Sequence, residues 1–136
     1  MSTVNRMLQV LTERRSRRCE EIMTQDVVLA APQDHTLYVS RIMIKKAISQ
    51  LPVKGNGQVI GTVTEESIIR NLSVDIAKEN VEKIMDPPLP SISKETSIDV
   101  VRRLLEDYTA ALVMDRGVIV GIITRSDLLK TTSDPI

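Results

Sequence analysis

The chain carries two copies of a short turn whose polar side chains could bind a ligand. The second copy, residues 121–127, reads Gly-Ile-Ile-Thr-Arg-Ser-Asp, and the first, residues 61–67, reads Gly-Thr-Val-Thr-Glu-Glu-Ser. A carboxylate such as that of Asp127 can accept hydrogen bonds from both hydroxyls of a ribose. A hydroxyl such as that of Thr124, beside free backbone amides, suits a phosphate. The second copy is therefore a candidate binding turn, to which Ser126 could add a third polar contact.

The same residues also fit a purely structural role. In a capping box, the side chain that starts a helix and the one three residues later each bond the other's backbone amide. Thr124 and Asp127 have this spacing. Both interpretations stay open at this point, because one threonine can cap a helix and contact a ligand.

The first copy of the turn differs at the position that matters most for chemistry. Ser67 stands where the second copy has Asp127, while Thr64 matches Thr124. A serine has one oxygen and no charge, so it cannot chelate two hydroxyls as a carboxylate does. We therefore expect one strong site at the second copy and a weaker second site at Thr64 and Ser67.

Composition limits the classes of function open to the chain. Its 136 residues suit one compact domain or two small halves. The 18 basic and 18 acidic residues cancel, so no overall field favours nucleic acid or an anionic membrane. Cys19 is the only cysteine, which excludes an internal disulfide and fits a reducing interior. No apolar run approaches the roughly 20 residues of a membrane span, so we expect a cytoplasmic protein without a membrane partner.

The sequence lacks the motifs of a self-contained enzyme. There is no Gly-x-Ser-x-Gly elbow, no Gly-x-x-x-x-Gly-Lys-Ser/Thr loop and no Gly-x-Gly-x-x-Gly fingerprint. His35 has no cluster of ligands at metal spacing, so we expect it in an exposed loop. The chain is therefore predicted to be no enzyme, to bind no metal and to require no cofactor.

The candidate turn belongs to an internal repeat. Three blocks recur in the same order, at offsets that shift from 62 to 61 to 60 residues, as two single-residue deletions in loops would produce. The matching blocks are residues 20–23 with 82–85, 35–43 with 96–104, and 51–70 with 111–130. The chain is thus predicted to contain an N-terminal helical extension (1–19), repeat 1 (20–73) and repeat 2 (82–131).

Each repeat is predicted to fold as strand, helix, strand, strand and helix. In repeat 1 a short strand near Val27–Leu29 precedes a polar run in which Asp34 or Thr36 could cap the helix. Two apolar runs then flank Asn56-Gly57, one of the strongest short hairpin signals. One repeat buries too little surface to be stable alone. We therefore expect a mixed α/β (α+β) fold, with two βαββα repeats packed about a pseudo-twofold axis after a short N-terminal helix.

The first helix of each repeat is predicted to present one apolar face to the core, with residues at i, i+3, i+4 and i+7. Extra apolar residues at Val39, Ile42 and Ile48 widen this face in repeat 1 and suggest contact with another helix. The predicted inward positions are Ser40, Met43, Ile44 and Ala47 in repeat 1, and Val101, Leu104, Leu105 and Tyr108 in repeat 2.

With this order of elements, the chain resembles a tandem pair of cystathionine β-synthase (CBS) domains, or Bateman module, over residues 20–131. The resemblance rests on Ile-Met at the opening of each repeat, Leu-Pro-Val before the hairpin, and a glycine followed by two residues and then Thr-x-x-Asp. It implies a regulatory sensor that binds an adenosine-containing ligand (AMP, ADP, ATP or S-adenosylmethionine) in the cleft between the repeats.

The resemblance also implies which residues surround the ligand. Thr109 and Ala110 stand where nucleotide-binding relatives often carry basic groups, so Arg125 is the nearest substitute and the number of phosphates stays open. For Leu29 and Ile48, an ordinary place in the core is an equal alternative. The residues implied around Asp127 and Thr124 are Thr24, Leu29, Ile48 and Ile122.

The remaining expectations concern partners. Val4, Met7, Leu8 and Leu11 have helical spacing and predict a docked helix, which a basic run at 14–18 follows. That run is short and has no aromatic neighbour, so nucleic acid is not the expected partner. The resemblance implies a homodimer formed through helices and a separate regulated protein. The alternatives are a ligand-free oligomerisation or protein-interaction module and a DNA-linked transcriptional regulator.

Overall fold

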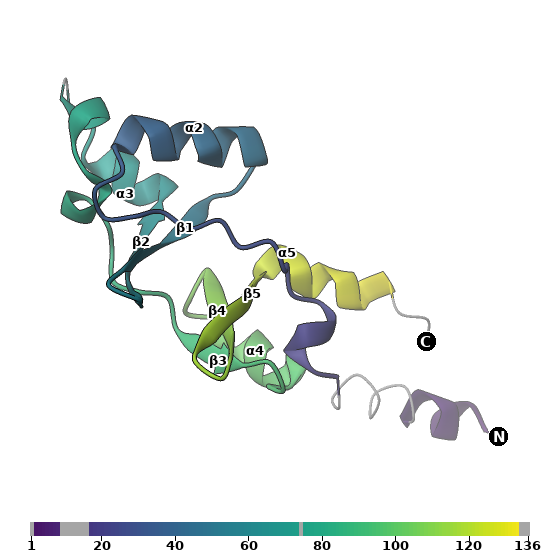
Figure 1. Cartoon of the computed structure of the whole chain (residues 1–136). Coiled ribbons are helices and arrows are strands. Elements are labelled where there is room, and N and C mark those ends of the chain that lie inside the picture. The colour runs from purple at the N-terminus through teal and green to yellow at the C-terminus, as the bar shows by residue number, and fades with distance from the viewer. Residues whose placement is uncertain (1, 9–16, 74, 134–136) are drawn as a thin grey trace. The chain divides into compact units, whose positions relative to one another are not determined.

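The computed structural model describes residues 2–8, 17–73 and 75–133. The chain divides into two compact units, which we call unit 1 (Met1–Val27 with Pro90–Ile136) and unit 2 (Val28–Leu89); Figure 1 labels their elements. Each unit combines the body of one repeat with the opening segment of the other, where the opening segments are residues 19–24 and 81–86. No helix in the described ranges is long and apolar enough to cross a membrane.

Unit 2 is built around a two-stranded antiparallel hairpin in which Gln50 lies opposite Thr64. Its elements are α2 (Thr36–Lys46), β1 (Gln50–Gly55), β2 (Gln58–Thr64), α3 (Glu65–Arg70) and the 3-10 helices η2 (Ile76–Lys78) and η3 (Val81–Lys83). Its buried apolar core consists of Ala30, Val39, Met43, Leu51, Val53, Val63, Val81 and Ile84.

Unit 1 has a three-stranded sheet in which β4 pairs parallel with β3 and antiparallel with β5. Its elements are η1 (Cys19–Glu21), β3 (Ser91–Ser93), α4 (Ile98–Leu104), β4 (Ala110–Asp115), β5 (Val118–Thr124), α5 (Arg125–Leu128) and η4 (Leu129–Ser133). Its buried apolar core consists of Cys19, Ile22, Ile98, Val101, Leu105, Ala111, Val113 and Ile123. In both units the opening segment therefore supplies core residues to the body of the other repeat.

Both hairpins turn as the sequence predicts. Asn56 and Gly57 have φ angles of 52° and 76°, and Arg116 and Gly117 have φ angles of 52° and 77°. Positive φ at both central residues is the hallmark of the type I′ turn, whose twist matches that of the paired strands. The hairpin prediction is thus confirmed in both repeats.

The strand predicted near Val27–Leu29 is wrong, because only Ala30 pairs there, in a single parallel bridge to Val53. The corresponding segment of unit 1 forms β3, and next to it Leu112 N–H donates to Pro90 O at 2.8 Å. Pro52 occupies the position of Leu112 and has no N–H to donate. The missing donor shortens the pairing in unit 2.

The predicted inward face of α2 is correct at Met43, but the face as a whole is shifted by about one residue. The buried residues of α2 are Thr36, Val39 and Met43, while Ile44 is 80% exposed. The residues with matching positions in unit 1 are Ile98, Val101 and Leu105, all of them buried, and Tyr108 is exposed. The helices α2 and α4 therefore align at an offset of 62 residues rather than 61. Because the hairpins align at an offset of 60, both single-residue deletions in repeat 2 fall between its helix and its hairpin.

Neither Asp34 nor Thr36 caps α2, in contrast to the prediction. The N-cap residue is His35, which is exposed and makes no side-chain capping bond. Asp34 instead accepts a bond from Ala31 N–H at 2.8 Å. Thr36 Oγ1 donates to the carbonyl oxygen of Glu79 at 2.9 Å, so the start of α2 is tied to the chain just before the second opening segment.

The N-terminal segment is helical at residues 3–8, as predicted. Its apolar side chains are nevertheless mostly exposed: Val4 by 64%, Met7 by 49% and Leu8 by 57%. This differs from the expected docked helix. Leu11, the last residue of the predicted apolar stripe, lies outside the described residues.

Candidate functional site

The Thr-x-x-Asp turn of unit 1 forms a capping box. Thr124 is the N-cap of α5, and its Oγ1 accepts the Asp127 N–H at 3.4 Å. The Thr124 N–H in turn donates to Asp127 Oδ2 at 2.9 Å. The structural interpretation of this motif is therefore correct, and it occupies one of the two carboxylate oxygens.

The other carboxylate oxygen of Asp127 faces groups that a capping box does not require. Thr24 Oγ1 donates to Asp127 Oδ1 at 3.2 Å, and Lys130 Nζ lies 2.7 Å from the same oxygen. Lys130 Nζ also donates to the carbonyl oxygen of Ile22 at 2.9 Å. The Asp127 side chain is only 6% exposed, whereas that of Lys130 is 53% exposed. A ligand would thus reach Oδ1 by replacing side chains that can move into water.

The opening segment reaches Asp127 because it pairs with β5. Thr24 N–H donates to Ile122 O at 2.8 Å, and Ile122 N–H donates to Thr24 O at 2.9 Å. At the neighbouring Gly121, an added Cβ would collide with the Met23 side chain and lie 3.1 Å from Thr24 O. The motif glycine and the Ile-Met pair therefore belong to one contact, which places Thr24 beside the carboxylate.

Arg125 and Ser126, which are also expected at this site, lie on α5, and the side chain of Arg125 makes a hydrogen bond. Arg125 Nε donates to the carbonyl oxygen of Leu105 at 2.9 Å, at the end of α4. The guanidinium thus satisfies a helix C-terminus, and a phosphate would have to share it. Ser126 is exposed on α5.

Leu29 and Ile48 belong to unit 2. Leu29 is 39% exposed. Ile48 is half-buried and packs against the core of unit 2.

The first turn, in unit 2, also forms a capping box. Thr64 N–H donates to Ser67 Oγ at 2.9 Å, and Ser67 N–H donates to Thr64 Oγ1 at 2.9 Å. Ser67 is fully buried. A serine therefore closes the same helix start that Asp127 closes in unit 1.

Sequence reasoning missed a carboxylate beside this first turn. Asp86, the residue after the second Ile-Met pair, accepts a bond from Thr64 Oγ1 at 3.4 Å. Arg70 Nη2 lies 3.1 Å from each of the two oxygens of Asp86. The repeat alignment contains the signal, since Asp86 stands where repeat 1 has Thr24. The sequence alone does not show that Asp86 pairs with Thr62, and it is this pairing that brings its carboxylate to the first turn.

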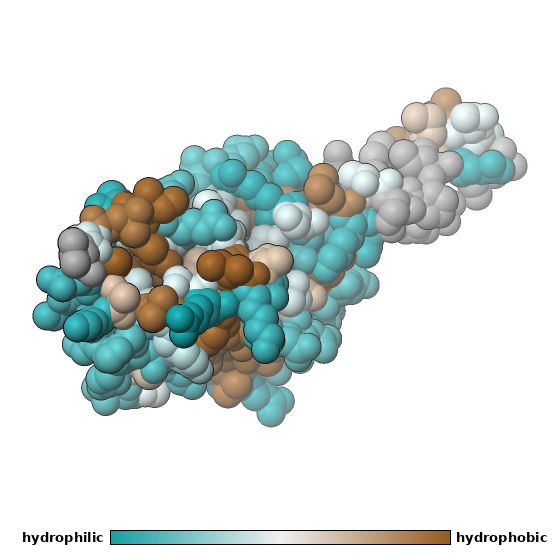
Figure 2. All heavy atoms as spheres, turned by 90° about the horizontal axis from the view of Figure 1, so that it is seen from above, coloured by the Kyte–Doolittle hydropathy of each residue, from teal (hydrophilic) through white to brown (hydrophobic). Residues whose placement is uncertain are grey.

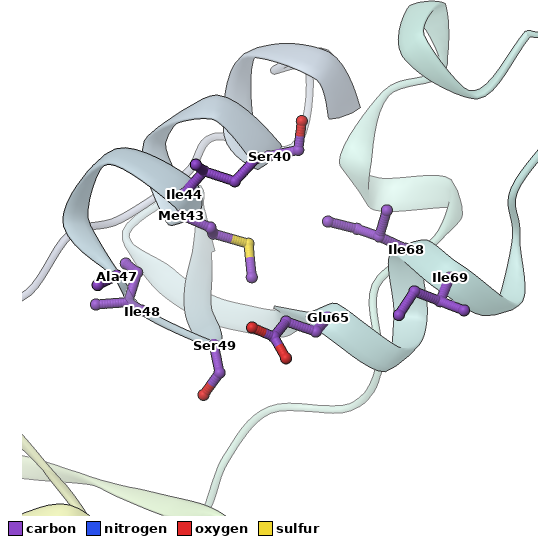
Figure 3. Close-up of a pocket in the computed structure, with 9 residues that line it drawn as sticks. All are labelled: Ser40, Met43, Ile44, Ala47, Ile48, Ser49, Glu65, Ile68 and Ile69. Atoms are coloured by element: carbon purple, nitrogen blue, oxygen red, sulfur yellow. The ribbon is translucent and has the colours of Figure 1, made fainter.

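An apolar groove runs between α2 and α3 in unit 2 (Figure 3) and has a volume of about 510 Å³. Ile44 and Ile69, which are 80% and 65% exposed, contribute to it. Figure 2 looks down on the side where Figure 1 draws α2 and shows apolar patches among hydrophilic side chains. The lining residues are Ser40, Met43, Ile44, Ala47, Ile48, Ser49, Glu65, Ile68 and Ile69.

Within the described part of the chain, no group of three or more His, Cys, Asp or Glu side chains is placed to hold a metal ion.

Two like units, each with a hairpin, a capped turn and an opening segment from the other repeat, define a tandem pair of small α+β repeats. The CBS domain family matches residues 19–74 and 81–134, so the chain belongs to the CBS domain family.

Solved structures of similar proteins agree with this assignment. A conserved uncharacterized protein from Pyrococcus horikoshii has a TM-score of 0.75 and 28% identity, over 90% of this chain and 96% of that one. Protein MJ1225 from Methanocaldococcus jannaschii, described as a candidate archaeal homologue of g-AMPK, has a TM-score of 0.78 and 25% identity, over 96% of this chain and 52% of that one. A CBS domain pair of protein MJ0100, solved with 5′-methylthioadenosine and S-adenosyl-L-methionine, has a TM-score of 0.74 and 22% identity, over 85% of this chain and 95% of that one.

The curated sequence of MJ1225 is 28% identical to this chain over 153 residues, which cover 93% of this chain and 55% of that protein. The chain thus spans about half the length of this curated relative.

Proposed function

We propose that the chain is a regulatory module that binds an adenosine-containing ligand, AMP, ADP, ATP or S-adenosylmethionine, mainly through Asp127 and Thr124. The observation that carries the proposal is the second oxygen of Asp127, which the capping box leaves to Thr24 and Lys130. The adenosine compounds in the MJ0100 structure support the ligand class, since that protein shares the fold.

The chemistry of binding follows from these contacts. Two ribose hydroxyls would replace the Thr24 hydroxyl and the Lys130 ammonium as donors to Asp127 Oδ1. Hydrogen bonds to a charged acceptor contribute about 1.5–3 kcal/mol each. The exchange keeps the carboxylate satisfied, while Oδ2 continues to hold the helix start. Ser126 and Arg125 are then the polar groups of the same turn that can meet a phosphate or other polar part of the ligand.

Regulation requires that the ligand bind two arrangements of the protein with different affinity. We propose that the ligand favours one arrangement of this chain and thereby changes the activity of a separate regulated protein. The module itself performs no catalysis. A cytoplasmic location stays a prediction from the sequence.

Calorimetric titration with AMP, ADP, ATP and S-adenosylmethionine tests the proposed function. We expect at least one of them to bind with a dissociation constant below millimolar. Asp127→Ala should abolish binding at the unit 1 turn, whereas Ser67→Ala should leave that binding unchanged. Failure of all four compounds to bind below millimolar would overturn the proposed function.

The groove in unit 2 favours a second role, which is association of two copies of this chain. Ile44 and Ile69 expose apolar surface on either side of it, and exposed apolar patches often mark interaction sites. Sedimentation of the protein at several concentrations tests this role. Ile44→Lys should convert a dimer to monomers, whereas Tyr38→Lys, on an exposed position of α2 outside the groove, should not.

The described part of the basic run does not favour a DNA-binding role. Arg17 Nε lies 3.6 Å from a Glu21 carboxylate oxygen, and Arg18 Nη1 lies 3.7 Å from Glu20. These arginines are paired with acidic groups of η1. Arg14 and Arg15 lie outside the described residues.

A further inference from the structure

The two turns contain the same kinds of chemical group, with a carboxylate and a hydroxyl exchanged between two positions. In unit 1 the carboxylate is on the helix, at Asp127, and the hydroxyl is on the opening segment, at Thr24. In unit 2 the helix carries the hydroxyl of Ser67, and the opening segment carries the carboxylate of Asp86. Each turn therefore has a carboxylate within hydrogen-bond distance of its N-cap threonine, although the Thr-x-x-Asp pattern occurs only once.

The exchanged residues occupy equivalent backbone positions. Asp86 N–H donates to Thr62 O at 2.8 Å, and Thr62 N–H donates to Asp86 O at 2.9 Å. Thr24 makes the same pair of bonds with Ile122, at 2.8 and 2.9 Å. Because the two opening segments pair in the same register, the side chains of Asp86 and Thr24 start from equivalent points relative to their turns.

The two carboxylates also reach equivalent neighbours. Asp127 Oδ2 lies 3.3 Å from Oγ1 of the N-cap residue Thr124, and Asp86 Oδ2 lies 3.4 Å from Oγ1 of the N-cap residue Thr64. Each carboxylate also pairs with a cationic side chain that lies three residues after Asp127 or Ser67, the residues that close the two capping boxes. Lys130 pairs with Asp127 in unit 1, and Arg70 pairs with Asp86 in unit 2.

Access differs between the two carboxylates and favours Asp86. Its side chain is 32% exposed, whereas that of Asp127 is 6% exposed. Asp86 has no part in closing the capping box, because Ser67 does this in the first turn. Both oxygens of Asp86 can therefore turn to a ligand without loss of the helix cap. The Arg70 side chain is 60% exposed, and its guanidinium could meet an anionic group of that ligand.

We propose that Asp86 is the ligand-binding carboxylate of the first turn, so that unit 2 holds a second site for the two neighbouring hydroxyls of a sugar. Thr64 and Arg70 complete this site, and Ser67 acts only as the helix cap. The ligand class rests on the proposed function. The inference replaces the expectation of a weak site at Thr64 and Ser67 with a site whose carboxylate comes from the other repeat.

Counting the ligand molecules bound per chain tests the inference, with AMP as the probe in equilibrium dialysis. The first variant is Asp127→Ser, which silences the unit 1 turn but keeps its helix cap, since serine closes the box in unit 2. We expect two AMP molecules per wild-type chain and one per Asp127→Ser chain. Adding Asp86→Thr should remove the remaining site.

A residue exchange then separates a binding role from a structural one. In the Asp127→Ser, Asp86→Thr background, Ser67→Asp rebuilds in unit 2 the arrangement found in unit 1, and we expect it to restore one bound AMP. Asp115→Asn is the matched control, because Asp115 pairs with Lys94 and belongs to neither turn. It should leave two sites. Circular dichroism at the binding temperature checks that each variant is folded.

The outcomes distinguish this inference from the function on which it rests. If the wild-type chain binds one AMP and Asp127→Ser removes it, the unit 2 site does not exist and only this inference is overturned. If the wild-type chain binds none of the four adenosine compounds, both are overturned. Should Asp86→Thr unfold the chain, Arg70→Gln gives a second measurement in the Asp127→Ser background. It removes the cation proposed to meet the phosphate of AMP and should weaken AMP binding several-fold, and unchanged binding would overturn the inference.

Discussion

Thr24 Oγ1 donates a hydrogen bond to Asp127 Oδ1 at 3.2 Å, across 103 positions of the sequence. The bond joins the opening segment of repeat 1 to the candidate ligand carboxylate of repeat 2, within unit 1. Cys19 and Ile22 of the same segment lie in the core of that unit. Each candidate turn thus contacts the opening segment of the other repeat, so neither repeat contains a whole candidate site of its own.

The capping role of Asp127 predicts a measurable loss of stability on substitution. Asp127→Ala removes the carboxylate that closes the capping box on the Thr124 N–H, and it leaves Thr24 and Lys130 without this acceptor. Loss of an N-terminal cap interaction costs about 1 kcal/mol, so we expect the free energy of unfolding in urea to fall by about 1–2 kcal/mol. Asp127→Ser should lose less, because serine can close the box as Ser67 does. Equal losses for the two variants would contradict this account of the cap.

The close approach of Met23 to Gly121 gives a second prediction. A Cβ at Gly121 would collide with the Met23 side chain and lie 3.1 Å from Thr24 O. Gly121→Ala must therefore displace the Met23 side chain and crowd the Thr24 backbone, and overpacking of this kind costs about 1–3 kcal/mol. We expect a loss of that size in urea unfolding, together with weaker ligand binding at Asp127. Val118→Ala, at an exposed position of the same strand, is the control and should change stability by less than about 0.5 kcal/mol.

The parts of the fold that depend on local sequence could be predicted. Asn56-Gly57 specifies the first hairpin because few residues tolerate the positive φ angles of the turn, and Gly117 has the corresponding positive φ in the second hairpin. The Thr-x-x-Asp spacing likewise identifies both the helix start and the candidate carboxylate. The inward face of α2 is less well specified by the sequence. A face centred on Val39 and Met43 and a face centred on Ser40 and Ile44 both have helical spacing, and only packing against the sheet selects the first.

Features that depend on contacts distant in sequence could not be predicted. The loss of the strand near Val27–Leu29 follows from Pro52, but only if Pro52 is known to lie opposite that segment. The role of Asp86 is similar. Its carboxylate is unremarkable in the sequence, and it becomes a candidate because pairing with Thr62 brings it beside Thr64. Sequence reasoning therefore predicted one candidate carboxylate, Asp127, and missed the carboxylate of Asp86 beside the other turn.

The ion pair of Lys130 with Asp127 yields a prediction about salt. Lys130 Nζ contacts Asp127 Oδ1 at 2.7 Å and Ile22 O at 2.9 Å, while half of its side chain is exposed. Partly exposed pairs contribute up to about 1 kcal/mol and weaken as salt screens them. Lys130→Met should therefore lower stability by about 1 kcal/mol or less in low salt. The difference from wild type should shrink in 1 M sodium chloride, and a salt-independent difference would point to packing of the lysine stem instead.

The buried thiol of Cys19 predicts how stability depends on pH. Cys19 is fully buried, and its Sγ donates to Ser93 O at 3.2 Å. Burial raises the pKa of the Cys19 thiol, and the nearby charge of Glu20 raises it further. The folded chain therefore keeps the thiol proton at alkaline pH values at which the unfolded chain has lost it. The resulting stabilisation is complete below the thiol pKa of the unfolded chain and is lost as pH rises through the pKa of the folded chain.

Cys19→Ala isolates this contribution, because the cavity that it creates costs the same free energy at every pH. We expect the wild-type chain to lose its stability advantage over Cys19→Ala as pH rises above the ordinary pKa of a thiol, in urea unfolding at a series of pH values. Thiol alkylation offers a separate measurement. Iodoacetamide should modify Cys19 only at the rate at which the chain opens, and Cys19 should become fully reactive in denaturant. Parallel stability curves for the two proteins, together with fast alkylation of the folded chain, would show that the thiol is not shielded in the core of unit 1.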